Sequence, residues 1–191
     1  GWAARLAANA ARAGLPMLFT STAMVFHHEP DGPHRPGDER TARDGYGRYK
    51  IACEDAVRAA HPGAAIAHIG WQIDPMQPGN NMLMALDDWQ RREGRVAASR
   101  AWTPACSFME DTAAALAGLL GRREAGILHL DSNAEEGWSF DRIVDALREQ
   151  FGRSDWRIEL HEDYRHDQRL LAGARRLMPP LSARLPALRA A

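Results

Sequence analysis

The sequence predicts an α/β protein built on a parallel sheet. Two short apolar runs, residues 16–20 and 64–69, have the length and the continuous apolar character of strands buried on both faces. A helical segment precedes the first run and another separates the two runs. The order helix, strand, loop, helix, strand is the alternation from which parallel sheets are built.

The first helix is expected over residues 2–13, which are rich in alanine, and Gly14 is placed to end it. Residues 29–44 are rich in Pro, Gly, Asp, His and Arg, so we expect a surface loop there. A second helix is predicted over 45–60, because His61, Pro62 and Gly63 follow it directly.

After residue 71 the predicted helices and strands no longer alternate regularly. Helices are predicted over 82–93, 109–120 and from Ser139 to about residue 151, and strands over 126–130 and 156–160. The arginine-rich end of the chain is expected to be helical, interrupted by prolines. We therefore expect residues 1–70 to form part of a sheet domain and residues 71–191 a smaller mixed α/β region whose helices return to the sheet.

Composition excludes several functions. The 24 basic and 25 acidic residues give a net charge of −1, which provides no global attraction to nucleic acid or an anionic membrane. The apolar stretches fall well short of the 18 or so residues that a membrane span needs. Cys53 and Cys106 form no CxxC pair, which favours buried thiols in a soluble, cytoplasmic protein.

One loop offers metal-binding side chains. His27, His28, Glu29 and His34 lie within it, but their spacing is irregular, so a surface loop is favoured over a metal site and no metal is expected.

A tyrosine and a lysine define the candidate catalytic site. Lys50 is the only lysine, and it follows Tyr46 by four residues, which places both side chains on one face of the predicted helix. Ser21 and Thr22 stand at the end of the preceding strand, where open parallel sheets place their ligand sites.

These residues resemble the Ser/Thr and Tyr-x-x-x-Lys triad of extended short-chain dehydrogenases/reductases. Within that superfamily the chain resembles the dTDP-4-dehydrorhamnose reductase group, also called the sugar-nucleotide-binding family. Its Ser-Thr-Asp-Tyr-Val-Phe motif corresponds to residues 21–26, and its Tyr-Gly-x-x-Lys motif to residues 46–50, followed by Glu54. The resemblance implies a Rossmann-like, doubly wound parallel sheet, of which residues 1–70 would be the back half.

The resemblance also implies the chemistry. Reducing a ketone needs a hydride at carbon and a proton at oxygen, and Tyr46 is the expected proton donor. A neighbouring ammonium lowers a phenol pKa, which suits Lys50, and the Thr22 hydroxyl can hydrogen-bond the carbonyl oxygen. The hydride implies NADPH or NADH, with Tyr46 and Lys50 also touching the cofactor.

Four further residues are expected to bind the sugar nucleotide. Trp71 matches a tryptophan that lies against the sugar, although a core aromatic is the alternative. Asn80 and Asn81 match an asparagine-bearing loop, with turn residues as the alternative. Arg169 lies in a loosely matching segment and could contact a diphosphate, whereas a solvated helix face is the alternative.

Two departures qualify the implied function. Ala23 stands where the family has aspartate, and no glycine-rich turn between a strand and a helix is present to hold a pyrophosphate. We therefore expect the chain to correspond to the carboxyl two-thirds of a longer protein, and to be inactive by itself.

The expected function of the intact protein is NAD(P)-dependent reduction of a nucleotide-linked 4-keto sugar. One alternative is a non-catalytic sugar-nucleotide or subunit-binding module, and another is an epimerase or dehydratase. Because the first strand would form a sheet edge, we also expect a homo-oligomer or a partner segment covering that edge.

Overall fold

Three parallel strands form the central sheet of the computed structural model, which describes residues 1–27, 29, 31–77, 79–173 and 176–190. They are β1 (Leu18–Thr22), β2 (Ala65–Ile69) and β7 (Gly126–Leu130), in the order β1-β2-β7. The parallel pairing of the first two strands confirms the sequence prediction. Strand β1 begins and ends two residues later than predicted, because Pro16 lies outside the pairing.

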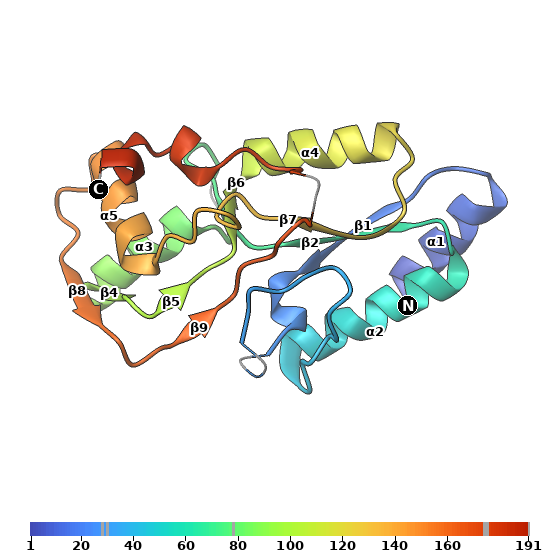
Figure 1. Cartoon of the computed structure of the whole chain (residues 1–191), viewed down its shortest axis with the longest axis horizontal. Coiled ribbons are helices and arrows are strands. Elements are labelled where there is room, and N and C mark those ends of the chain that lie inside the picture. The colour runs from blue at the N-terminus through green and yellow to red at the C-terminus, as the bar shows by residue number, and fades with distance from the viewer. Residues whose placement is uncertain (28, 30, 78, 174–175, 191) are drawn as a thin grey trace.

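Helices cover both faces of this sheet (Figure 1). Helices α1 (Trp2–Arg12) and α2 (Gly45–Ala60) pack on one face, around Ala7, Val57 and Ile66. Helix α4 (Met109–Gly121) covers the other. The sheet is therefore doubly wound, and its third strand β7 and the covering helix α4 both come from the second half of the chain.

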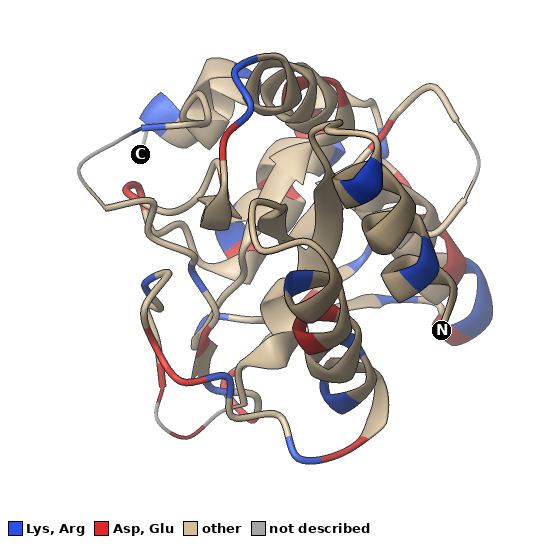
Figure 2. Cartoon of the chain, turned by 90° about the vertical axis from the view of Figure 1, so that its right-hand side faces the viewer, with Lys and Arg blue, Asp and Glu red and all other residues tan. Residues whose placement is uncertain are grey.

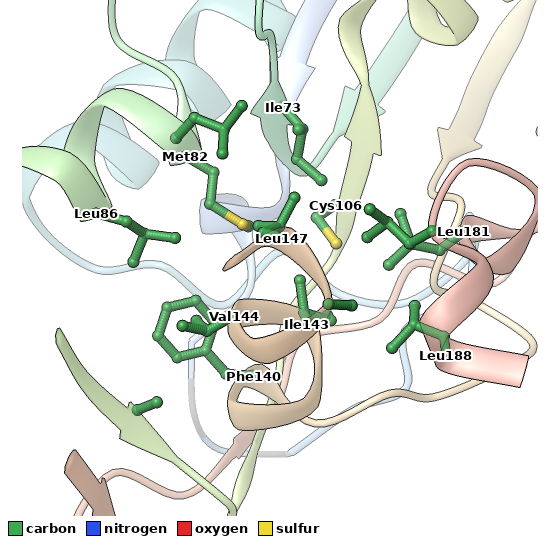
Figure 3. Packing of buried hydrophobic residues seen from close by; sticks show 14 of the residues in the cluster. Ile73, Met82, Leu86, Cys106, Phe140, Ile143, Val144, Leu147, Leu181 and Leu188 are labelled. Carbon is green, nitrogen blue, oxygen red and sulfur yellow. The ribbon is translucent and has the colours of Figure 1, made fainter. Parts of the chain in front are cut away.

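The second region contains short parallel strand pairs and two further helices. The remaining elements are β3 (Trp71–Ile73), α3 (Met82–Glu93), β4 (Val96–Ser99), β5 (Trp102–Thr103), β6 (Cys106–Phe108), α5 (Phe140–Gln150), β8 (Ile158–His161), β9 (His166–Asp167) and the 3-10 helices η1 (Ala23–Val25), η2 (Leu181–Ala183) and η3 (Pro186–Ala190). Strand β3 pairs with β6, β4 with β8, and β5 with β9. This region holds the largest apolar cluster, in which α5 buries Phe140, Ile143 and Leu147 against α3 and η2 (Figure 3).

Two sequence expectations need correction. The arginine-rich C-terminal segment contains no α-helix among its described residues, since Pro180 and Pro186 allow only the short helices η2 and η3. The loop over 29–44 is partly buried in its described part. His34 is 3% exposed and stacks on Phe26 with ring centres 4.2 Å apart, so this loop packs against the sheet domain.

Acidic and basic residues are interspersed over the helices and loops (Figure 2). This distribution agrees with the small net charge of the sequence. Among the described helices, none is long and apolar enough to cross a lipid bilayer.

Candidate active site

A cleft of about 680 Å³ opens beyond the carboxyl ends of β1 and β2. Segments from both halves of the chain form its walls. The lining residues are Ser21, Thr22, Ala23, Met24, Tyr46, Ile69, Gly70, Trp71, Gln72, Asn80, Trp102, Tyr164 and Gln168. A cleft at this end of a parallel sheet is where such folds bind ligands.

Thr22 and Tyr46 bring two hydroxyl groups to this cleft from different elements. Thr22 ends β1, and its Oγ1 accepts a hydrogen bond of 3.2 Å from the backbone N–H of Met24, which caps η1. Tyr46 lies in the first turn of α2 and is 53% exposed. The two hydroxyl-bearing residues that the sequence predicts to act together therefore share one cleft.

Lys50 lies one turn further along α2, behind Tyr46. Its Nζ donates a hydrogen bond of 2.7 Å to the backbone oxygen of Thr20 and lies 4.3 Å from the ring centre of Phe19. The distance from Nζ to the centre of the Tyr46 ring is 6.0 Å. Burial lowers the pKa of Lys50, although Cys53 and Glu54 act in the opposite direction. The ammonium is thus held between strand β1 and the tyrosine, and does not itself line the cleft.

Trp71 forms part of an aromatic wall. Its ring stacks on Trp102 with ring centres 6.2 Å apart and an interplanar angle of 29°. Trp102 in turn packs against Phe140 at 4.4 Å and meets Tyr164 edge to face at 5.3 Å. Trp71 therefore both packs against the apolar cluster and lines the cleft, so the two interpretations of its sequence position are compatible.

The two asparagines separate in the structure. Asn80 lines the cleft. Asn81 is 2% exposed and caps α3: its Oδ1 accepts from the Met84 N–H, while its Nδ2 donates to the Gln77 carbonyl. The cap occupies both ends of the Asn81 amide, so this residue has a structural position and the structure does not bring it to the cleft.

Arg169 is also held away from the cleft. Its guanidinium forms paired hydrogen bonds of 2.9 and 2.7 Å with the carboxylate of Asp167, and a third of 3.2 Å with the carbonyl of Ala134. The preceding residue, Gln168, lines the cleft instead. The ion pair with Asp167 occupies the Arg169 guanidinium. Gln168 is therefore the residue of this segment that a ligand in the cleft would contact.

A buried polar chain beneath the cleft was not predicted from the sequence. Ser21, His68 and His129 are neighbours in the register of β1, β2 and β7, and so form one row across the sheet. The His68 ring nitrogens lie 3.1 Å from His129 and 3.1 Å from Glu54. Ser21 donates a hydrogen bond to the same Glu54 carboxylate. The sequence signal that could have indicated this chain is a histidine, His68 or His129, inside each of two otherwise apolar strands.

Burial and hydrogen bonding oppose one another at Glu54. Burial alone would raise its pKa, but hydrogen bonds from His68, Ser21 and Arg40 outweigh it and lower the pKa. Arg40 belongs to the loop over residues 29–44, and its guanidinium lies 3.0 Å from the Glu54 carboxylate. Glu54, four residues after Lys50, therefore links α2, the sheet and this loop.

The sequence also singled out the histidines near residues 27–34 as metal ligands to consider, and the two cysteines. The described residues contain no group of three His, Cys, Asp or Glu side chains arranged to hold a metal, and His28 lies outside the described residues. Cys106 is fully buried, which raises the pKa of its thiol well above the usual value, whereas Cys53 is partly exposed. Cys106 is thus a buried structural thiol, as expected, whereas the expectation that Cys53 is also buried was wrong.

The doubly wound sheet and the cleft at its strand ends define a Rossmann-like α/β fold. A family model described as the RmlD substrate binding domain matches residues 2–152. The chain therefore belongs to the dTDP-4-dehydrorhamnose reductase-like family.

A comparison with a curated relative agrees with that assignment. The dTDP-4-dehydrorhamnose reductase of Mycobacterium tuberculosis H37Rv is 32% identical over 126 residues, covering 61% of this chain and 41% of the relative. The matched part of the chain thus spans less than half the length of that relative.

Solved structures share the fold. A dTDP-4-dehydrorhamnose reductase from Clostridium acetobutylicum superposes on this chain with a TM-score of 0.80 and 17% sequence identity. The match covers 98% of this chain and 70% of the C. acetobutylicum chain. The enzyme of the same name from Bacillus anthracis was solved in complex with NADP, and it matches with a TM-score of 0.79 and 14% sequence identity. This match covers 98% of this chain and 69% of the B. anthracis chain.

Proposed function

We propose that the protein containing this chain is an NAD(P)-dependent reductase of a nucleotide-linked 4-keto sugar. The observation that carries the proposal is the placement of Thr22 and Tyr46 on one cleft with Trp71, while the Lys50 ammonium lies behind the tyrosine. The names of the relatives make dTDP-4-dehydrorhamnose the first substrate to test.

Each of the three residues has one task in the proposed reduction. The Thr22 hydroxyl donates a hydrogen bond to the carbonyl oxygen of the sugar, where negative charge develops. The Tyr46 hydroxyl gives its proton to that oxygen, so the ketone becomes an alcohol once a hydride has reached the carbon. The positive charge of Lys50, 6.0 Å from the tyrosine ring, favours the phenolate that remains.

A nicotinamide cofactor, NADPH or NADH, supplies the hydride when bound. The chain fits the reacting end of such a cofactor. An ammonium has three N–H donors, and the Lys50 ammonium uses one of them on the Thr20 carbonyl, which leaves donors for a ligand hydroxyl. A pyrophosphate site is not supplied within the described ranges, where no parallel strand leads through a glycine-rich turn into a helix.

A non-catalytic binding module is the second candidate. Ala23 lines the cleft and is 3% exposed, so the methyl group stands where the family's aspartate would offer a carboxylate. A protein that binds the sugar nucleotide without reducing it would tolerate this loss.

Cofactor oxidation by the full-length gene product tests the proposal. NADPH and NADH oxidation is followed with dTDP-4-dehydrorhamnose as the substrate, in the parent protein and in Tyr46→Phe and Lys50→Met. We expect each variant to lose about 100-fold or more in kcat, the usual contribution of a positioned proton donor.

Tyr49→Phe is the matched control, because Tyr49 lies on the same helix, is 64% exposed and does not line the cleft. It should keep the parent rate. Sugar-nucleotide binding without cofactor oxidation would support the binding module instead, and an unchanged rate in Tyr46→Phe would contradict the proposed proton donor.

A further inference from the structure

Helix α2 is fastened to the end of β1 at two successive turns. The Lys50 ammonium donates a hydrogen bond of 2.7 Å to the backbone oxygen of Thr20, and the Ser21 hydroxyl donates one to the Glu54 carboxylate. Tyr46, Lys50 and Glu54 are spaced by four residues, so they lie along one face of the helix. Both attachments therefore come from the face that carries the tyrosine, and both reach the last part of the strand.

The attachment through Glu54 is protected and held from several sides. Ser21 and Glu54 are both buried, so water does not compete for the hydrogen bond between them. His68 on β2 lies 3.1 Å from the same carboxylate oxygen, and Arg40 lies 3.0 Å from the other oxygen. Because three different segments hold the carboxylate, its hydrogen bond to Ser21 resists a shift of the strand end.

The two neighbouring hydroxyl groups at the end of β1 are used differently. A serine hydroxyl has one hydrogen to donate, and Ser21 gives it to Glu54, so none is left for a carbonyl oxygen in the cleft. Thr22 Oγ1 accepts a hydrogen bond from the Met24 N–H, which leaves its own hydrogen available. Of the two residues, only Thr22 can therefore donate to a ligand.

The position of Tyr46 depends on how α2 lies on the sheet. Its side chain is half exposed in the first turn of the helix, so the packing of its own ring does not fix it. A misplacement of about 1 Å between reacting groups can cost about 100-fold in rate. The contacts between α2 and β1 therefore determine whether Thr22 and Tyr46 are aligned well enough to act together.

We propose that the hydrogen bond from Ser21 to Glu54 keeps Thr22 aligned with Tyr46, which makes Ser21 and Glu54 positioning residues for the reduction. The inference rests on the proposed function, because it assumes that Thr22 and Tyr46 act on one carbonyl oxygen. For this role neither Ser21 nor Glu54 has to contact the substrate.

A double-mutant cycle in the full-length gene product tests whether Ser21 acts through Thr22. Ser21→Ala, Thr22→Val and the double variant are assayed by cofactor oxidation with dTDP-4-dehydrorhamnose. We expect Ser21→Ala to lower kcat about 10-fold in the parent but less than about twofold in the Thr22→Val background, where no hydroxyl is left to align. The KM of Ser21→Ala should stay within about twofold of the parent value, because the hydrogen bond affects alignment and not binding.

Ser182→Ala is the matched control. Ser182 is buried and donates a hydrogen bond to the Glu136 carboxylate, as Ser21 does to Glu54, but it does not line the cleft. Both substitutions remove a buried hydroxyl from a carboxylate, so both should lower the melting temperature. Only Ser21→Ala should lose kcat, which separates alignment from general stability.

Substitutions of Glu54 test the same hydrogen bond from its other end. Ser21 and His68 both contact Oε1, whereas Arg40 contacts Oε2. Glu54→Gln can therefore keep the acceptor for Ser21, and Glu54→Met removes it. We expect Glu54→Met to lose about 10-fold in kcat and Glu54→Gln to recover most of that loss. Melting curves show which variants are folded, and this comparison tests the inference even if Ser21→Ala does not fold.

The possible results separate the inference from the proposed function. A working reductase whose Ser21→Ala variant keeps the parent kcat overturns the inference alone, and so does an equal loss in the parent and in the Thr22→Val background. A Glu54→Gln variant as impaired as Glu54→Met also overturns it, because the acceptor for Ser21 would then not be the feature that matters. A parent protein that oxidises neither NADPH nor NADH with a nucleotide-linked 4-keto sugar overturns both proposals.

Discussion

Ser21, His68 and His129 show how single residues link the layers of this protein. They lie side by side on three strands, and Glu54 from α2 covers their row. Each is at most 3% exposed. Buried polar side chains are tolerated when they are hydrogen-bonded to one another, so the four residues stabilise one another's burial.

His129 should make the stability of the protein depend on pH. Burial, and then the neighbouring His68, lowers its pKa from 6.5 to about 3. Between these values the unfolded chain binds a proton that the folded chain does not. Stability is therefore complete above pH 6.5 and falls as the pH drops towards 3, with a loss of about 2 kcal/mol at pH 5.

Urea unfolding of the parent and of His129→Asn at pH 7.5 and 5.0 measures this contribution. Burial raises the pKa of Asp131 to about 7, which gives an opposite slope, but both proteins retain Asp131 and its contribution cancels in the comparison. The parent should lose about 2 kcal/mol more than the variant between the two pH values. Equal losses would show that His129 is not held neutral in the folded protein.

At the scale of the element, the start of α2 determines whether Thr22 and Tyr46 can share a cleft. Gly47 follows Tyr46 and lies directly under η1. A Cβ atom at Gly47 would approach the Met24 carbonyl oxygen to 2.0 Å and the Ala42 Cβ to 2.7 Å. The close approach of backbone to backbone therefore requires glycine, although glycine is unfavourable in a helix.

Replacing Gly47 by alanine should destabilise the protein, against the usual trend. We expect a loss of about 1–3 kcal/mol from the overlap with Met24, measured by urea unfolding. Gly121→Ala at the end of α4 is the matched control, because no atom lies within 4 Å of its added Cβ, and it should gain about 0.5 kcal/mol. A stabilised Gly47→Ala would contradict the packing of α2 on η1.

At the scale of the whole molecule, the central sheet has an open side. Among the described strands, β1 pairs only with β2. Phe19 on β1 is partly exposed, as is the preceding Leu18. An edge strand with apolar side chains and unpaired backbone groups associates readily with another strand.

We expect the 191-residue chain to self-associate through this edge. Size-exclusion chromatography with light scattering should give a mass above the 21.2 kDa monomer. Thr20→Lys places a charge on the exposed middle of β1 and should shift the chain towards monomer, as charged residues on natural edge strands do. Ala114→Lys, on an exposed position of α4, should leave the mass unchanged. A monomeric parent chain would contradict the prediction.

Periodicity and punctuation predicted the larger elements well. Helix α2 begins and ends where the sequence placed it, since Gly45 follows a polar loop and Pro62 stops the helix. The short strands β3, β4, β5, β6 and β9 were missed, because two to four residues carry too little pattern. They exist through pairing with distant strands, which local sequence does not reveal.

The candidate site divides in the same way. Thr22 and Tyr46 were expected at the cleft from motif and spacing, and Trp71 was expected there from the family resemblance; all three line it. Asn81 and Arg169 were expected to contact the ligand, and the structure shows them in a helix cap and an ion pair. A side chain's type shows what it can bind. Its partner depends on which group lies nearest, and for Arg169 that group is Asp167.

The sequence by itself determined the α/β class, the parallel pairing of the first two strands and the placement of Thr22 and Tyr46, because these follow from local periodicity and from short motifs. Only the tertiary structure decided that Ser21, His68 and His129 form one row, and that Gln72 and Trp102 face the same cleft. Ser21 and His68 are 47 positions apart in the chain, His68 and His129 are 61 apart, and Gln72 and Trp102 are 30 apart. Contacts over such separations arise from the packing of the whole chain, which minimises exposed apolar surface and unpaired polar groups together.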